Sequence, residues 1–171
     1  MKNPAIYEDM LAKLEHVYEH GPSPDFREFT VPTSAYLDPS RFEDERRLLR
    51  SLPTPVAHVS QLEALGSCLV HDALGVPILV ARSRDGELTA MLNVCRHRGT
   101  RLVEDAGFCR VKKGFRCVYH GWTYDTGGRL THVPREELFP TLDKKALALT
   151  KLPVTERFGF VWVVATPGHD Y

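Results

Sequence analysis

The sequence predicts a mainly β protein, made of small antiparallel sheets and preceded by an N-terminal helical arm. From Val56 onward, short runs of β-type residues alternate with turn residues, and Asp85-Gly86 separates two of these runs as a hairpin signal. Before that point, apolar residues recur at helical spacing. With 171 residues, of which 43% are apolar, the chain can bury one core. We therefore expect an arm at 1–52 and one β domain at 53–171.

A first helix is expected at the start of the arm. Asn3 can cap this helix, and Gly21 and Pro22 end it. Its apolar residues keep helical spacing: Ile6, Met10, Leu14, Val17 and Tyr18. His16 and His20 lie one turn apart, a spacing that suits a metal ion. With no third ligand in sight, we interpret them as imidazoles near a helix C-terminus, where positive charge is favourable.

The rest of the arm is expected to contain an extended segment and a second helix. The segment 22–37 is rich in proline and serine and has no clear period, which predicts extended chain. Asp38 and Pro39 then begin a helix that runs through Arg50, before Pro53. Its many charged residues predict a solvated surface.

The β domain is expected to consist of hairpins. Strands flank Asp85-Gly86, Thr126-Gly127-Gly128 and the turn at 156–159, while 116–119 supplies a loop. In chain order, the strands are expected at 67–71, 76–83, 88–94, 122–124, 129–132, 149–155 and 160–164. Short strands and frequent turns favour antiparallel pairing.

Two pairs of cysteine and histidine form the clearest motif of the chain. Cys95 and His97 belong to Cys-Arg-His-Arg-Gly, and Cys117 and His120 belong to Cys-Val-Tyr-His-Gly-Trp. A 2Fe-2S cluster of mixed ligation needs two thiolates on one iron and two imidazoles on the other. Two loops that each supply one cysteine and one histidine meet this need. In this hypothesis Cys95 and Cys117 hold the buried iron, and His97 and His120 hold the exposed one.

These motifs resemble the N-terminal Rieske domain of the large subunit of ring-hydroxylating oxygenases, multicomponent enzymes that add oxygen to aromatic and related compounds. The likeness extends to Asn93, Val94, Arg101, Leu102, Phe115, Thr123, Tyr124, Gly128 and Leu130. It implies three small antiparallel sheets, with a Rieske 2Fe-2S cluster carried at the tip by two loops. Gly99 and Gly121 would let the backbone turn closely around the cluster, and Trp122 and Tyr124 would pack beneath it.

Two positions separate the chain from Rieske proteins of the respiratory bc type. Those proteins carry an additional cysteine in each motif, joined in a disulfide beside the cluster, where this chain has Thr100 and Tyr119. The resemblance therefore favours the oxygenase or ferredoxin branch. It implies a reduction potential near the low end of the Rieske range, which runs from roughly −150 to +300 mV. Val118 replaces the proline usual in the family, which affects the expected stiffness of the loop and leaves the ligands unchanged.

Three functions are compatible with the motif. The first is the electron-transfer domain of an oxygenase large subunit, which the helical arm favours because simple Rieske ferredoxins are smaller and lack one. The second is a stand-alone Rieske ferredoxin, a soluble electron carrier. The third is a zinc-stabilised interaction module without redox activity. Zinc also binds cysteine and histidine, but Cys-x-His is an unusual spacing for its structural sites.

The first interpretation implies an electron donor and an acceptor. A ferredoxin or flavoprotein reductase would supply the electron, and the oxygenase catalytic domain would receive it at a mononuclear Fe(II), in a homotrimer of the full-length form. Two histidines and one carboxylate hold such iron. The chain ends at Tyr171, where that domain should begin, so we expect no oxygenase activity from this chain alone.

Charge and composition suggest further expectations. The net charge is zero, so nothing global indicates nucleic acid or a membrane surface. Between Cys95 and Leu130, however, eight Arg or Lys accompany three acids, and this predicted basic collar would steer an acidic electron donor unless its residues are simply solvated. No secretory signal follows Met1, so a cytoplasmic protein is expected, with Cys68 and Cys109 as free thiols.

Overall fold

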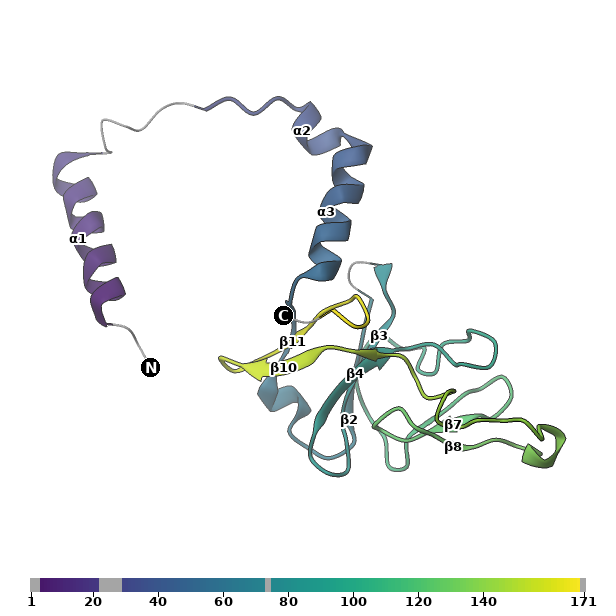
Figure 1. Ribbon diagram of the computed structural model, residues 1–171. Helices are drawn as coiled ribbons and strands as arrows, with labels where there is room; N and C mark the ends of the chain where they lie inside the picture. Colours follow the sequence, from purple (N-terminus) through teal and green to yellow (C-terminus); the bar gives the residue numbers. More distant parts are fainter. Residues whose placement is uncertain (1–3, 22–28, 73–74, 170–171) are drawn as a thin grey trace. The chain divides into compact units, whose positions relative to one another are not determined.

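The computed structural model describes residues 4–21, 29–72 and 75–169 (Figure 1). Contacts between residues divide the chain into two units, Met1–Pro39 and Ser40–Tyr171. The boundary between an arm at 1–52 and a domain at 53–171 stays a prediction. Within the described residues, no helix is both long and apolar enough to cross a membrane.

Among its described residues, the first unit contains the helices α1 (Pro4–His20) and α2 (Ser34–Leu37). α1 confirms the first predicted helix, and it ends where Gly21, at a φ of 77°, donates its N–H to the carbonyl of Val17 at 2.9 Å. The predicted cap, Asn3, lies outside the described residues, as do residues 22–28. α2 corrects the expectation of an extended segment, because the Pro32 carbonyl accepts the N–H of Ala35 at 2.9 Å and starts a helical turn.

The second predicted helix is confirmed as α3 (Pro39–Ser51), which has no buried residue. Salt bridges about one turn apart join Arg41 to Glu45 at 3.0 Å, Arg46 to Glu43 at 2.8 Å and Arg47 to Asp44 at 3.1 Å. Such pairs support a helix whose surface is mostly solvated. Near its end, the carbonyl of Arg50 accepts a hydrogen bond from the hydroxyl of Thr166 at 3.0 Å.

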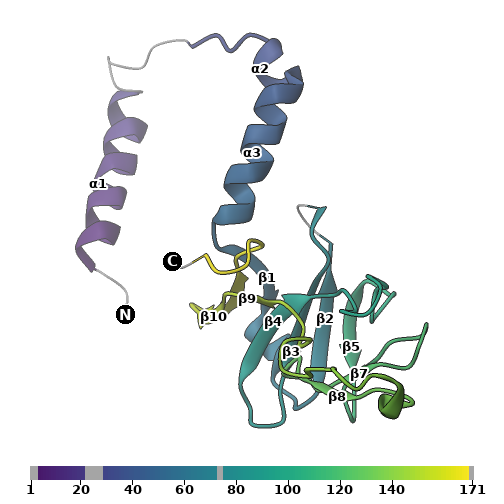
Figure 2. The same cartoon turned by 45° about the vertical axis from the view of Figure 1, so that its right-hand side comes forward.

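Three antiparallel sheets form the second unit and confirm the predicted fold class (Figures 1 and 2). The first has the order β1 (Thr54–His58), β11 (Phe160–Val163), β10 (Val154–Arg157). The second has the order β5 (Gly107–Arg110), β2 (Ser67–His71), β3 (Ile78–Arg82), β4 (Leu88–Leu92), β9 (Lys151–Leu152). The third has the order β6 (Phe115–Arg116), β7 (Thr123–Tyr124), β8 (Leu130–His132). The 3-10 helices η1 (Val59–Leu62) and η3 (Glu136–Leu138) lie in the connections.

The central strands β2 and β3 of the five-stranded sheet are buried on both faces. One face packs on the third sheet and contributes Cys68, Val70, Leu79, Ala81 and Met91 to their shared core. The other face packs on the first sheet and contributes Leu69, Ile78, Val80 and Ala90. A strand with two buried faces needs apolar residues at consecutive positions, which explains the unbroken apolar runs of β2 and β3.

Some strands differ from the sequence-based expectation. β1, β5 and β6 were not expected, since β1 contains Pro55 and the other two are too short to show a period. The single strand expected at 149–155 is divided between β9 and β10. Pro153 has no N–H to donate, and the chain passes there from the five-stranded sheet to the first sheet.

Cys68 and Cys109 form a disulfide, so the expectation of two free thiols was wrong. They stand opposite each other in the pairing of β2 with β5, with Cα atoms 4.8 Å apart. Because β5 gave no strand signal, the sequence did not indicate that these cysteines are neighbours. The disulfide fastens the edge strand β5, which lies between the two Cys-His motifs in the chain.

Candidate metal centre

The two Cys-His motifs form loops with the same hydrogen-bond pattern. We call residues 95–100 the first ligand loop and residues 117–122 the second. The N–H of Cys95 and that of Cys117 each donate to the carbonyl five residues later, at 2.8 Å. Gly99 and Gly121 donate back to the cysteine carbonyls at 2.9 and 3.0 Å, and both adopt a positive φ. Equivalent turns therefore present a cysteine at the same place in each loop, although the histidines are spaced differently.

Asn93 closes the base of the first ligand loop. Its side-chain oxygen accepts the N–H groups of Leu102 and Val103, each at 3.1 Å, and its amide donates to the carbonyl of Val103 at 2.7 Å. The Asn93 N–H also donates to the carbonyl of Pro77 at 2.8 Å. Since Asn93 is fully buried, these bonds hold both ends of the loop on the end of β4.

The predicted ligands are arranged with sulfur inside and imidazole outside. Cys95 and Cys117 are only 2% and 3% exposed, whereas His97 is half-buried and His120 is exposed. The ring centroids of the two histidines lie 4.7 Å apart, at an angle of 73°. Nδ1 of His97 is buried and has no hydrogen-bond partner. A buried nitrogen of this kind is satisfied when it binds a metal.

The donors do not form a site for a single ion. Among the described residues, no three His, Cys, Asp or Glu side chains are placed to hold one metal ion. A binuclear cluster does not require such a group, because each iron takes two protein ligands. On α1, the rings of His16 and His20 stack at 4.6 Å, and Nδ1 of His20 lies 3.2 Å from the carbonyl of His16.

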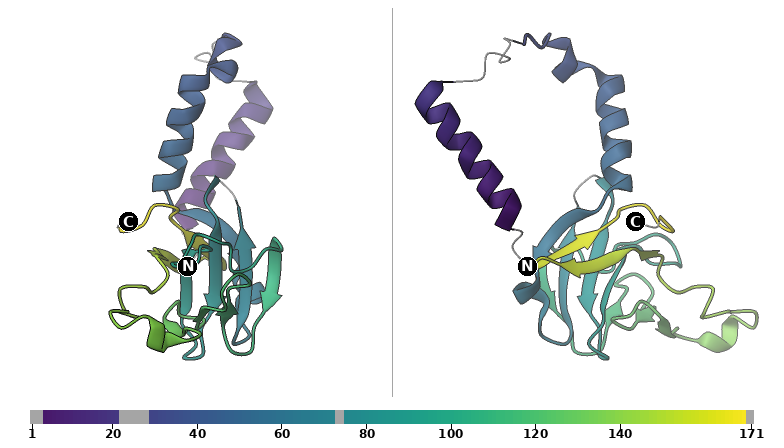
Figure 3. Two further views of the ribbon diagram at one scale, coloured as in Figure 1. Left: turned by 90° about the vertical axis from the view of Figure 1, so that its right-hand side faces the viewer. Right: turned by 60° about the vertical axis from the view of Figure 1, so that its left-hand side comes forward.

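Trp122, the last residue of the second ligand loop, supports the ring of His97. The two rings stack almost parallel, with centroids 4.7 Å apart and an interplanar angle of 5°. Trp122 is 4% exposed and also meets the ring of Phe139 edge-on at 6.3 Å. Phe139 belongs to the long connection between β8 and β9, which runs outside the sheets in Figure 3. Trp122 therefore packs as expected, while the contribution of Phe139 was missed because its segment shows no period.

Tyr124 reaches the sulfur side of the site. Its ring is fully buried, and its hydroxyl lies 3.5 Å from Sγ of Cys95 and accepts the N–H of Arg96 at 3.1 Å. Packing beneath the loop was expected, but this polar contact was missed. Strand alternation was the available signal, because a strand expected at 122–124 places Trp122 and Tyr124 on the same face.

Burial dominates the electrostatics of the site. It raises the pKa of the Cys95 thiol, although hydrogen bonds from the Tyr124 hydroxyl and the His97 backbone act in the opposite direction. Burial also lowers the pKa of His97, and the nearby His120 and Arg98 add to this effect. A neutral imidazole is the form that binds metal, whereas a thiol must release its proton as metal binds.

The predicted basic collar is not one continuous surface. Arg96, Arg98 and Arg116 are exposed residues of the ligand loops or their immediate flanks. Arg101 pairs with Asp72 at 2.7 Å, and Arg129 pairs with Asp125 at 2.8 Å. Arg110 and Lys112 line a separate groove. Only part of the local positive charge is therefore free to act beside the ligand loops.

Comparisons with known proteins agree with this geometry. The family model of the Rieske 2Fe-2S domain matches residues 53–144, more than half of the chain. Chlorobenzene dioxygenase subunit alpha of Cupriavidus sp. (strain PS12) is 41% identical over 117 residues, which cover 67% of this chain and 25% of that protein. The carnitine monooxygenase oxygenase subunit of Escherichia coli (strain K12) is 31% identical over 140 residues, which cover 81% of this chain and 37% of that protein.

Solved structures show the same likeness. The quaternary ammonium Rieske monooxygenase CntA in complex with L-carnitine superposes with a TM-score of 0.76 at 29% identity, over 83% of this chain and 40% of that chain. Naphthalene 1,2-dioxygenase from Rhodococcus sp. superposes with a TM-score of 0.74 at 26% identity, over 99% of this chain and 37% of that chain. In these four comparisons the chain spans between 25% and 40% of the relative's length.

Proposed function

Because this chain belongs to the Rieske 2Fe-2S domain family and is related to oxygenase alpha subunits, we propose that it transfers single electrons as the electron-accepting domain of a ring-hydroxylating oxygenase component. A Rieske cluster takes up one electron and gives one up. The observation that supports this function best is the pair of equivalent loops, each with a buried cysteine and a histidine nearer the surface.

The proposed ligands are Cys95 and Cys117 for the inner iron and His97 and His120 for the outer iron. The residues fit this assignment in two ways. Both thiols are buried among apolar side chains, where a metal-bound thiolate is shielded from water. The otherwise unpartnered Nδ1 of His97 would gain a partner in the metal.

The exposed side of the second ligand loop is the proposed docking face for the electron donor, a ferredoxin or flavoprotein reductase. A hollow of about 550 Å³ lies here, lined by Val118, Tyr119, His120 and Arg116 among others. Arg116 of this hollow, together with the exposed Arg96 and Arg98 of the first ligand loop, would attract an acidic donor and raise the association rate. The rate of reduction should then fall as ionic strength rises, and a rate independent of salt would contradict this docking face. The acceptor would be the mononuclear iron of an oxygenase catalytic domain.

Spectroscopy of the purified chain tests the function directly. Iron and acid-labile sulfide should be present in equal amounts, and reduction by dithionite should give an electron paramagnetic resonance signal with an average g below that of all-thiolate clusters. Such a signal reflects mixed cysteine and histidine ligation. A colourless protein that contains zinc would contradict the proposal and favour a structural module.

Tyr124→Phe is expected to lower the reduction potential while leaving the fold intact. The Tyr124 hydroxyl, placed 3.5 Å from Sγ of Cys95, would donate a hydrogen bond to the metal-bound thiolate and favour the reduced, more negative state. Loss of one such bond corresponds to a decrease of roughly 20–60 mV. A dye-mediated redox titration measures it. Tyr36→Phe is the control, because Tyr36 is 77% exposed and lies on α2, outside both ligand loops. Equal potentials for the two variants would refute a role for the Tyr124 hydroxyl.

A further inference from the structure

The end of the five-stranded sheet away from the ligand loops carries its own polar features. β4 leads from Leu92 into the first ligand loop, and Leu92 pairs with Ile78 at that end of the sheet. At the opposite end Arg82 pairs with Leu88, and Arg110 pairs with the first residue of β2. Side chains that gather at this opposite end are therefore separate from the proposed metal centre.

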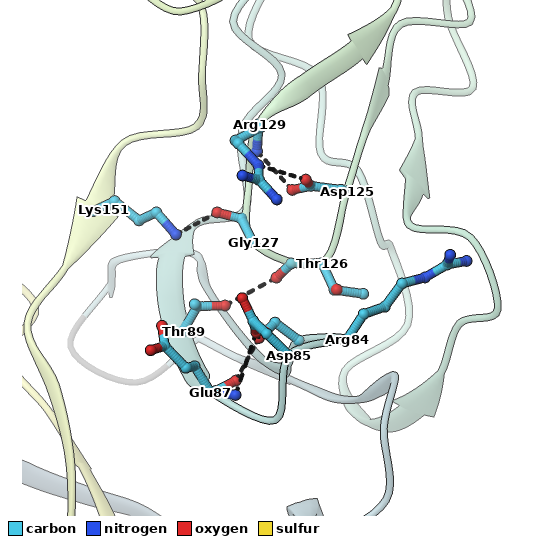
Figure 4. A pocket seen from close by; sticks show the side chains of 10 residues that line it. Arg84, Asp85, Glu87, Thr89, Asp125, Thr126, Gly127, Arg129 and Lys151 are labelled. Atoms are coloured by element: carbon cyan, nitrogen blue, oxygen red, sulfur yellow. Dashed lines mark hydrogen bonds and ion pairs between the residues drawn. The ribbon is translucent and has the colours of Figure 1, made fainter.

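In one pocket at this end, several charged side chains bond to other lining residues (Figure 4). It has a volume of about 530 Å³ and lies between the turns of two hairpins. The Asp125 carboxylate accepts hydrogen bonds from the backbone N–H and Nε of Arg129, both at 2.8 Å, and Lys151 donates to the carbonyl of Gly127. In Figure 4 the guanidinium of Arg84 points away from these groups. Arg84 is thus available to the neighbouring groove.

That neighbouring groove is cationic and contains no acid among its lining residues. Its volume is about 720 Å³, and its charged residues are Arg84, Arg110 and Lys112. All three side chains are exposed, and none forms a salt bridge with a described residue. Leu65 and Val111 provide an apolar wall.

The floor of the groove is rigid. The N–H of Val111 donates to the carbonyl of Gly66 at 2.8 Å, and the N–H of Gly66 donates to the carbonyl of Arg82 at 2.9 Å. Gly66 has a φ of 77°, and a side chain there would collide with the Val111 carbonyl. Nη2 of Arg84 donates to the backbone carbonyl of Lys112 at 2.6 Å, which fixes the Arg84 guanidinium beside the chain at Lys112. A guanidinium held in place loses little freedom when it binds an anion.

We propose that this groove binds the phosphate groups of a small phosphorylated molecule. Two guanidinium groups and one ammonium match the charge and the acceptor oxygens of a diphosphate. The apolar wall would contact the organic part of the ligand. The volume also falls within the range of small-molecule sites, roughly 300–1,000 Å³.

Isothermal titration calorimetry with inorganic pyrophosphate, and separately with ADP, tests the site at constant ionic strength. We expect saturable one-to-one binding of both, with ADP bound at least as tightly because its ring system can contact Leu65 and Val111. Arg110→Gln and Lys112→Gln should each weaken binding by roughly tenfold or more, the effect of removing one charged hydrogen bond. Both positions are exposed, and far-UV circular dichroism verifies that the variants fold.

Lys113→Gln is the matched control. It removes the same charge from the adjacent position, but Lys113 does not line the groove. Binding should remain within about twofold of the parent chain, as expected for a solvated charge. Non-saturable binding, or an equal loss in Lys113→Gln, would overturn the proposal by showing general attraction to a positive surface. The outcome is independent of the redox function, because the metal centre lies at the other end of the sheet.

Discussion

A chain with His120 replaced by alanine is expected to fold but to retain little or no 2Fe-2S cluster. His120 is exposed, and its ring contacts are with His97 and Tyr119 of the ligand loops, so its removal should hardly affect the packing of the sheets. It would, however, leave the outer iron with one protein ligand instead of two. Loss of an outer hydrogen-bond partner of a metal ligand already costs roughly 10–100-fold in affinity, and loss of the ligand itself should cost more. Iron content and the visible spectrum after purification measure the effect.

The control for this variant is His132→Ala. His132 is also exposed, and it lies on β8, opposite Thr123 in the third sheet and outside both ligand loops. It should retain full iron content and an unchanged spectrum. If the His120 variant also kept full iron content and an unchanged spectrum, His120 would be removed from the proposed ligand set. Another residue would then have to bind the outer iron. Melting curves of the two variants distinguish cluster loss from unfolding.

The metal centre could be inferred from sequence because its chemistry is local. Each motif fits within one turn, so cysteine, histidine and the glycine with positive φ are close in the chain and their spacing is visible. The contacts that support the site are not local. Asn93 joins residues about ten positions apart, and Tyr124 reaches Cys95 across 29 positions. Such contacts depend on how the sheets stack, which periodicity does not reveal.

The fold was predicted best where strands are long and flanked by clear turns. β2 was located at its observed residues, and the hairpin of β3 and β4 was found from its turn. Its loop closes between Ser83 and Glu87, with Gly86 at a φ of 85°. The disulfide was missed for the opposite reason, since the four-residue strand carrying Cys109 has only one fully apolar side chain, Phe108, and that side chain is exposed. Edge strands bury few side chains and leave little pattern in the sequence.

Gly114→Ala should prevent the third sheet from forming and thereby disrupt the second ligand loop. Gly114 precedes β6 and has a φ of 120°. A Cβ at this position would overlap the carbonyl oxygen of Tyr124 and lie 3.0 Å from Cα of Asp125. The positive φ costs roughly 1–2 kcal/mol, and overlap with a backbone that cannot rotate away adds about 1–3 kcal/mol or more. This is a large fraction of the roughly 5–15 kcal/mol by which a domain is stable.

Gly86→Ala separates these two contributions. Gly86 also has a positive φ, 85°, but nothing lies within 4 Å of the position that its Cβ would take. The variant should therefore lose only the stability that an alanine at a positive φ costs. Its melting temperature should decrease by on the order of 5 °C, and its iron content should stay normal. Gly114→Ala should show a much larger decrease and a loss of iron, because β6 runs directly into Cys117. Equal decreases for both variants would mean that the chain at Gly114 can move away from Tyr124, and that the third sheet does not hold the second ligand loop as tightly as its contacts indicate.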